Sequence, residues 1–123
     1  MHPHHTQTIQ NVKKYFQKDS EVLALLLSGS IAHGFESPAS DVDIMIIVSE
    51  EIFQKRFQER QLTFFNMDLS TYDGGYVDGK YLSLNFVKQV LEKGSEPARF
   101  AFEGSQVLFN TLEGFEAEIR RGR

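Results

Sequence analysis

Two aspartates, Asp41 and Asp43, stand at the start of the apolar run IMIIV that covers residues 44–48. Such a run predicts a buried strand, and residues two apart on a strand face the same side. The two carboxylates therefore project together, and at about 4 Å their repulsion amounts to roughly 4 kcal/mol at an effective dielectric of about 20. A proton or a bound cation has to relieve that repulsion. Because carboxylate oxygens suit hard ions, the pattern indicates a Mg²⁺ site shared with substrate phosphates.

A turn of small residues, Gly29-Ser30, follows an earlier apolar run over residues 22–27. Gly29 lets the backbone at the end of that predicted strand approach a ligand closely, and Ser30 can cap a short helix predicted over 31–35. Amides and a hydroxyl at the start of a helix suit a phosphate group. The alternative is a plain turn from strand to helix, but the aspartates that follow favour the phosphate role.

The pair Gly29-Ser30, ten further residues and then the box Asp41-Val42-Asp43-Ile44 together resemble the signature of the nucleotidyltransferase superfamily related to DNA polymerase beta. That signature is a hydrophobic strand, Gly-Ser or Gly-Gly, a spacer of about ten residues, and an Asp-hydrophobic-Asp-hydrophobic box. A Gly-Ser pair alone is a weak signal, whereas the joint pattern is specific. The resemblance covers about residues 22–110. It implies the nucleotidyltransferase fold, of class α/β (α+β), a mixed β-sheet flanked by helices.

In this superfamily a third aspartate on a later, neighbouring strand completes a metal-binding triad. Asp78, in the segment YVDGKYLS, looks like that residue, and Asp68 is its rival. Lys80 shares a strand face with Asp78, so it is either a phosphate partner or simply a partner in a same-face ion pair. The resemblance implies two sets of site residues, namely Asp41, Asp43 and Asp78 as catalytic ligands of two Mg²⁺ ions, and Gly29, Ser30 and Lys80 as positions that contact the nucleotide.

The remaining elements follow from hydrophobic periodicity and turn residues. Ile9, Val12 and Phe16 recur at helical spacing, so they predict an amphipathic helix that packs on the core. A turn at Gly74-Gly75 predicts that its two flanking strands pair as a hairpin. The expected helices cover residues 6–18, 31–35, 49–61, 84–93 and 98–102, and the expected strands cover 22–27, 41–48, 62–69, 76–83 and 106–110, the last at a sheet edge.

Two of these helices carry apolar residues that we expect to face the core. The basic and acidic residues between them, Arg56 among them, are expected to form a solvated face. The expected inward residues are Ile52, Phe53 and Phe57 in the helix over 49–61, and Phe86, Val87, Val90 and Leu91 in the helix over 84–93.

Length and composition set the limits. The 123 residues suit a single domain over 1–123, either a minimal form or the N-terminal part of a longer protein. We expect residues 1–5, with three histidines, to be a disordered start rather than a metal site. The absence of cysteine excludes disulfides, and no apolar run suits a membrane span, so a cytoplasmic location is expected. The net charge of −4 argues against binding long nucleic acid.

The resemblance implies an Mg²⁺-dependent nucleotidyltransferase that moves a nucleoside monophosphate from a nucleoside triphosphate, ATP first among them, to a hydroxyl group and releases pyrophosphate. The small size and acidic charge favour a small molecule or a protein as the acceptor. One alternative is a non-catalytic nucleotide- or partner-binding module that needs a helical domain, a second copy or a second chain, as in toxin–antitoxin pairs. Another is a structural domain in which the first two aspartates only cap a loop.

Overall fold

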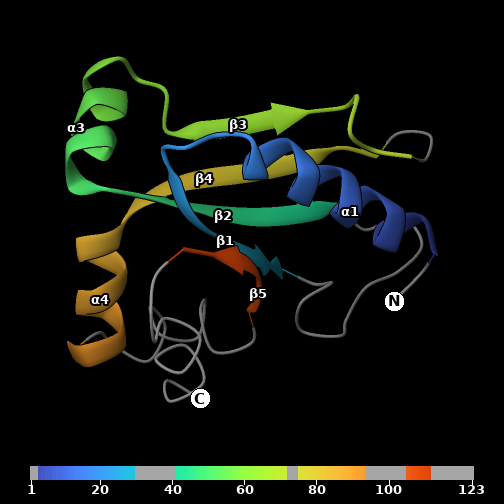
Figure 1. Cartoon of the computed structure of the whole chain (residues 1–123). Helices are drawn as coiled ribbons and strands as arrows, with labels where there is room; N and C mark the ends of the chain where they lie inside the picture. Colours follow the sequence, from blue (N-terminus) through green and yellow to red (C-terminus); the bar gives the residue numbers. More distant parts are fainter. Residues whose placement is uncertain (1–2, 30–40, 72–74, 94–104, 112–123) are drawn as a thin grey trace.

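The computed structural model describes residues 3–29, 41–71, 75–93 and 105–111 of the chain. Five strands form one mixed sheet in the order β3-β4-β2-β1-β5, with helices packed on it (Figure 1). This architecture confirms the predicted class, a mixed sheet flanked by helices. The helices are α1 (Pro3–Gln17), α3 (Glu50–Gln58) and α4 (Leu84–Lys93), and the strands are β1 (Val22–Ser28), β2 (Val42–Val48), β3 (Thr63–Asn66), β4 (Val77–Ser83) and β5 (Gln106–Asn110).

The sheet has β2 and β1 near its centre, and its two edges are β3 and β5. β1 runs antiparallel to β2 and to β5, and β3 runs antiparallel to β4, so the predicted hairpin and the predicted edge strand are both confirmed. β2 and β4 are parallel, with α3 and β3 between them in the chain. Parallel neighbours need such a crossover because the chain has to return to the starting end of the first strand, which a tight turn cannot do.

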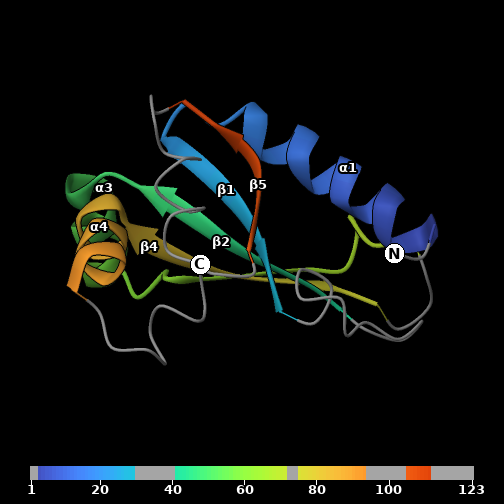
Figure 2. The ribbon, with the colours of Figure 1, turned by 90° about the horizontal axis from the view of Figure 1, so that it is seen from below.

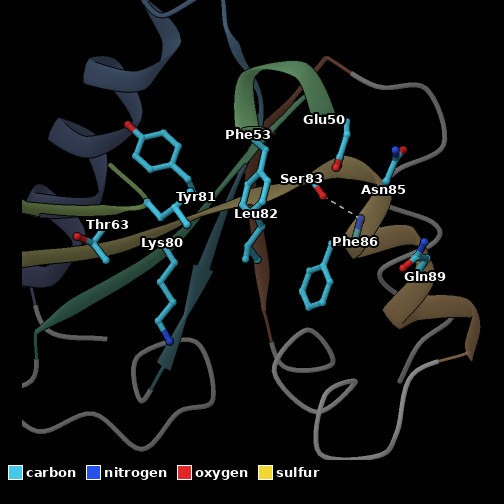
Figure 3. A pocket seen from close by; sticks show the side chains of 11 residues that line it. Glu50, Phe53, Thr63, Lys80, Tyr81, Leu82, Ser83, Asn85, Phe86 and Gln89 are labelled. Atoms are coloured by element: carbon cyan, nitrogen blue, oxygen red, sulfur yellow. Dashed lines mark hydrogen bonds between the residues drawn. The ribbon is translucent and has the colours of Figure 1, made fainter. Parts of the chain in front are cut away.

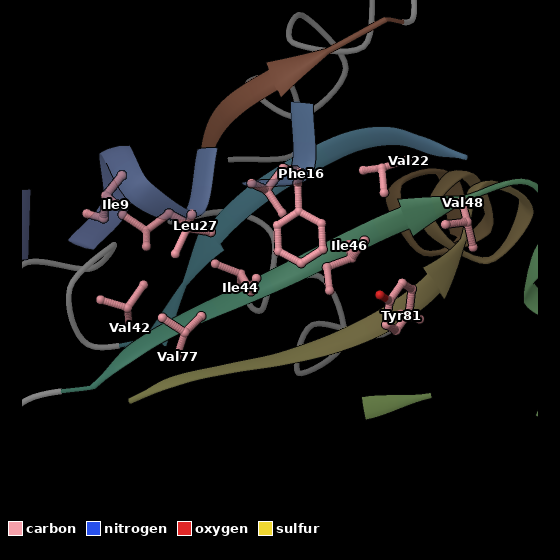
Figure 4. Close-up of a cluster of buried hydrophobic side chains, with 12 residues drawn as sticks. Ile9, Phe16, Val22, Leu27, Val42, Ile44, Ile46, Val48, Val77 and Tyr81 are labelled. Carbon is pink, nitrogen blue, oxygen red and sulfur yellow. The ribbon is translucent and has the colours of Figure 1, made fainter. Parts of the chain in front are cut away.

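One face of the sheet is covered by α1. The helix places Ile9, Val12 and Phe16 on a buried cluster made by alternate residues of β1, β2 and β4 (Figure 4). The Phe16 ring lies edge-on to Phe64 of β3, with 5.0 Å between ring centroids. The strand residues of this cluster are Val22, Leu25, Leu27, Val42, Ile44, Ile46, Val48, Val77 and Tyr81.

The opposite face is covered at one end by α4, whose Val87 and Val90 pack with Met45, Ile47 and neighbouring residues of β1. α3 follows β2 and α4 follows β4 directly, so both helices lie at the same end of the sheet (Figures 1 and 2). The starts of β2 and β4 lie at the other end. Of the helices that the structure describes, none combines the length and apolarity that a bilayer crossing requires.

The expected disorder of residues 1–5 is wrong for Pro3–His5, which form the first turn of α1; Met1 and His2 lie outside the described residues. Proline suits a first helical turn because its missing N–H needs no partner there. The turn is also tied to the loop after β3, since the Thr71 hydroxyl donates to the carbonyl of His4 at 3.0 Å. His5 is fully buried, so this segment contributes to the core.

Two predicted inward residues face solvent instead. Phe57 of α3 is 59% exposed, because Arg56 and not Phe57 faces β4: its guanidinium lies 3.7 Å from the ring centroid of Tyr81. Arg56 is therefore not part of a purely solvated face. Phe86 of α4 is 46% exposed, whereas Val87 and Val90 are buried as expected. The predicted short helices over 31–35 and 98–102 and the side chain of Leu91 lie outside the described part of the chain.

Candidate active site

Strand register brings two of the predicted acids together. In the parallel pairing of β2 with β4, Asp43 lies directly opposite Asp78, and in the antiparallel pairing of β1 with β2 it lies opposite Ser28. Register partners point to the same face of a sheet, so both carboxylates share the face that α4 partly covers. Asp68, the rival third acid, is exposed in the turn after β3 and has no such register. Asp78 is therefore the better-placed partner of Asp43.

Gly29 directly follows the last residue of β1 and lies against Asp43. Its φ of +72° lies in the left-handed region that other residues rarely adopt. A Cβ atom at this position would also overlap the Asp43 carboxylate, so only glycine permits the observed approach of backbone to acid. The predicted phosphate-binding turn thus begins next to Asp43. Ser30, the second residue of that turn, lies outside the described residues.

Asp41 precedes β2 and is held by a residue that the sequence did not single out. The Tyr76 hydroxyl donates a hydrogen bond to the Asp41 carboxylate, and this bond is the main reason that the pKa of Tyr76 is raised. The backbone supports the pair, since the amide of Val42 donates to the carbonyl of Tyr76 at 3.3 Å. Tyr76 lies in a glycine-rich turn sequence, and its contact with Asp41 could not be predicted without the register of β2 with β4.

The charges in this cluster act strongly on Asp43. Burial raises the pKa of its carboxyl, the neighbouring charges of Asp78 and Asp41 raise it further, and the ammonium of Lys80 partly opposes them. Lys80 lies opposite Met45, which puts it on the same face as both Asp43 and Asp78. The predicted crowding of like charges is therefore present, with one lysine close enough to offset part of it.

The donor chemistry fits magnesium. Carboxylate oxygens are hard ligands, and a divalent cation would relieve the repulsion that the exposed Asp78 and the neighbouring Asp41 exert on the half-buried Asp43. Within residues 3–29, 41–71, 75–93 and 105–111, however, no three His, Cys, Asp or Glu side chains are arranged to hold an ion together. Asp43 and Asp78 are the residues already side by side.

An exposed aromatic pair borders the acids. Phe65 of β3 is 62% exposed, lies opposite Asp78 in the β3–β4 register and contacts the Tyr76 ring at 4.8 Å between centroids. The sequence predicted a strand here but gave no sign of an aromatic edge beside Asp78. Register is again what places it.

A mixed sheet whose strand ends bring a glycine turn up to paired aspartates is the arrangement of a nucleotidyltransferase-type domain. The sequence model of the family described as polymerase beta, nucleotidyltransferase matches residues 10–95. The chain therefore belongs to this family, as its sequence signature predicted.

More distant comparisons add little. No match is found among curated proteins. Among solved structures, one described as the crystal structure of a toxin-antitoxin with AMP-PNP is similar at 14% sequence identity and a TM-score of 0.47. The similarity covers 93% of this chain and 82% of that chain. A likeness this remote carries no conclusion about function.

Proposed function

We propose that this protein is an Mg²⁺-dependent nucleotidyltransferase, which transfers a nucleoside monophosphate from ATP or another nucleoside triphosphate to a hydroxyl group of a small molecule or protein. The observation that supports it best is the placement of Asp43 beside Asp78 and against Gly29, in a chain of the polymerase beta nucleotidyltransferase family. Phosphoryl transfer needs mainly positioning and charge neutralisation, which a cluster of this kind is suited to provide.

The proposed roles follow the layout of the site. Asp41, Asp43 and Asp78 would hold two Mg²⁺ ions, which when bound would neutralise the charge of the phosphates. Gly29 and Ser30 would seat the β- and γ-phosphates with backbone amides. Lys80 would contact a phosphate of the nucleotide.

Asp78 is proposed as the general base, because it lies on the β4 side of the acids, away from Gly29. It takes the proton of the acceptor hydroxyl, whose oxygen attacks the α-phosphorus. The bond from the α-phosphorus to the bridging oxygen breaks, and pyrophosphate leaves with the electron pair. Tyr76 keeps Asp41 oriented through its hydrogen bond.

Thermal unfolding with each of the four nucleoside triphosphates, with and without Mg²⁺, tests nucleotide binding. A triphosphate at one hundred times its dissociation constant should stabilise the fold by about 2.7 kcal/mol. Asp43→Ala should remove this effect and all pyrophosphate release, whereas Asp68→Ala, a change of an exposed acid, should leave both unchanged. Loss of turnover in Asp68→Ala but not in Asp43→Ala would contradict the assignment.

Release of pyrophosphate across a panel of alcohols, phenols and hydroxyl-bearing proteins tests catalysis separately. Mg²⁺-dependent ATP binding without any pyrophosphate release would favour the non-catalytic binding module. If neither Mg²⁺ nor any nucleotide changes the thermal unfolding, the alternative of a purely structural domain would be supported.

A further inference from the structure

A pocket of about 570 Å³ opens beside the acidic cluster, between β4, the start of β3 and the helices α3 and α4 (Figure 3). Lys80 lines it, and Lys80 is only two residues, about 6.6 Å along the strand, from Asp78. Lys80 and Leu82 line the pocket from the face of β4 that carries Asp78, whereas Tyr81 lines it from the α1 face, and Lys80 is the lining residue of β4 nearest in sequence to Asp78. The size of the pocket is that of a small-molecule site.

The lining of the pocket is mainly apolar. Phe53 of α3, Leu82 of β4 and Phe86 of α4 surround its centre (Figure 3). Phe86 is fixed at the first turn of α4, where its backbone amide donates to the Ser83 hydroxyl at 3.0 Å. Val87 and Val90 already supply the core contacts of α4. The Phe86 ring, which is 46% exposed, is therefore not needed to hold this helix on the sheet. An exposed ring that lines a pocket is a contact surface for a ligand.

Charge is sparse in this pocket. Glu50 lies at the end formed by α3 and α4, and its carboxylate already accepts from the Gln54 amide at 3.0 Å. Among the described residues of the lining, Lys80 is the single cation, and it lies at the end toward the acids. One acid already engaged and one lysine do not suit a polycationic ligand, whereas apolar walls with a few polar groups suit a ring system with a hydroxyl.

The position of the pocket selects between the two substrates of the proposed reaction. Across the sheet, Gly29, Asp43 and Asp78 follow one another on β1, β2 and β4. With the triphosphate seated at Gly29, pyrophosphate leaves on the β1 side, and an in-line nucleophile has to arrive from the β4 side. The pocket lies on β4 and β3, which is the nucleophile's side.

We infer that this pocket binds the apolar body of the acceptor, an alcohol or phenol built on one or two rings, and presents its hydroxyl past Lys80 to Asp78. The inference rests on the proposed function and narrows its acceptor from any hydroxyl compound to an apolar-bodied small molecule. A carbohydrate-like or polycationic acceptor is not expected.

The first test needs neither metal nor nucleotide. Amide chemical shifts of the full ¹⁵N-labelled chain are followed during titration with 4-phenylphenol, and with sorbitol as a hydroxyl compound that has no apolar body. We expect 4-phenylphenol to shift the amides of Leu82, Phe86 and Gln89, and sorbitol to shift none. Shifts confined to other surfaces would overturn the inference.

Variants locate the binding site. Phe86→Ala, which removes one wall, should weaken 4-phenylphenol binding by about ten-fold, the equivalent of about 1.4 kcal/mol. Gln89→Trp fills the space from an exposed helix position and should block binding while the fold is retained. Phe57→Ala, a change of a phenylalanine that is 59% exposed and lies outside the pocket, should have no effect. Equal weakening by Phe57→Ala, or full binding in Gln89→Trp, would overturn the inference.

A titration with ATP and Mg²⁺ separates this inference from the proposed function. We expect shifts at Gly29 and Asp43 and none at Phe86. Shifts at Phe86 and Gln89 would show that the pocket holds the nucleotide base, which overturns the inference but not the proposed function. No shift with ATP, together with binding of 4-phenylphenol in the pocket, would overturn the proposed function and leave the ligand class of the pocket in place.

Discussion

The two faces of β2 and β4 differ in what they carry. Toward α1, β2 is apolar from end to end, with Val42, Ile44 and Ile46 fully or almost fully buried, and β4 adds Val77 and Tyr81 to the same core cluster. On the other face the strands begin with Asp43 and Asp78 and turn apolar only toward α4. Alternate residues of one short strand thus belong to the core and to the candidate site. The comparison teaches that burial on the α1 face stabilises the fold, while repulsion between carboxylates on the acidic face lowers that stability.

Substitution on the α1 face should have the largest effect. Phe16→Ala removes a ring that is 1% exposed and packed against Phe64, so the free energy of unfolding should fall by about 3–5 kcal/mol. Urea denaturation measures the loss. Tyr15→Ala, at the 48% exposed neighbour on the same helix, is the control and should cost less than about 1 kcal/mol. A loss in Phe16→Ala as small as that in Tyr15→Ala would mean that Phe16 does not anchor α1 to this face.

The acidic end should be sensitive to shape as well as charge. Gly29→Ala imposes a left-handed φ on alanine and pushes its Cβ into the Asp43 carboxylate, so it should cost about 1–3 kcal/mol. Thermal and urea unfolding measure this, with Ser28→Ala as the neighbouring control. A neutral Gly29→Ala variant would show that the close approach is not required.

Removal of one charge from the acidic end should act in the opposite direction. Asp43→Asn relieves repulsion by Asp78 and Asp41, so at pH 7 and without metal it should stabilise the fold by about 0.5–1 kcal/mol after allowance for solvent screening. Asp68→Asn, at an exposed acid, should change stability by less than that amount. A destabilised Asp43→Asn variant would mean that Asp43 is held by favourable contacts and not crowded by its neighbours.

The smallest effect concerns pH and returns to the α1 face. Burial raises the pKa of Tyr81 above 10.0, although Arg56 partly opposes the shift. The folded state therefore prefers the neutral phenol, and this contribution to stability is complete below pH 10.0 and is lost as pH rises through the folded-state pKa. The contribution of Tyr81 to the slope should stay below about 1.4 kcal/mol per pH unit, the limit for one proton, and Tyr76, whose pKa is also raised, adds to the slope in the same direction.

Unfolding measured between neutral and strongly alkaline pH checks this slope. Tyr81→Phe should reduce the slope, because it removes one of the two phenols whose pKa is raised. An unchanged slope in Tyr81→Phe would assign the alkaline loss to other groups.

Prediction from sequence succeeded where the local pattern alone decides the structure. The apolar runs at β1 and β2 are long enough to specify buried strands, and both strands lie where the sequence predicted them. The resemblance carried by Gly29-Ser30 and the acidic box Asp41-Val42-Asp43-Ile44 implied the nucleotidyltransferase fold, and the family match confirms it.

What the sequence left open depends on tertiary register and packing. The adjacency of Asp43 and Asp78 comes from the parallel pairing of strands far apart in the chain, and the same pairing brings Tyr76 to Asp41. In α3, Arg56 and Phe57 are neighbours, and only the position of Tyr81 decides which of them faces the sheet. The N-terminal turn of α1 looked disordered because its anchor, Thr71, lies in a distant loop.

The parallel pairing of β2 with β4 also couples the candidate chemistry to the order of folding. The connection between β2 and β4 contains α3 and β3, so the strand with Asp78 pairs with a strand that is distant in the sequence. Closing so long a connection is slow and entropically costly. A chain with only β1 and β2 in place holds an incomplete set of acids. If the proposed function holds, a chain in which β4 has not docked beside β2 should bind neither Mg²⁺ nor a nucleoside triphosphate, so the onset of Mg²⁺ binding during refolding would report the docking of β4.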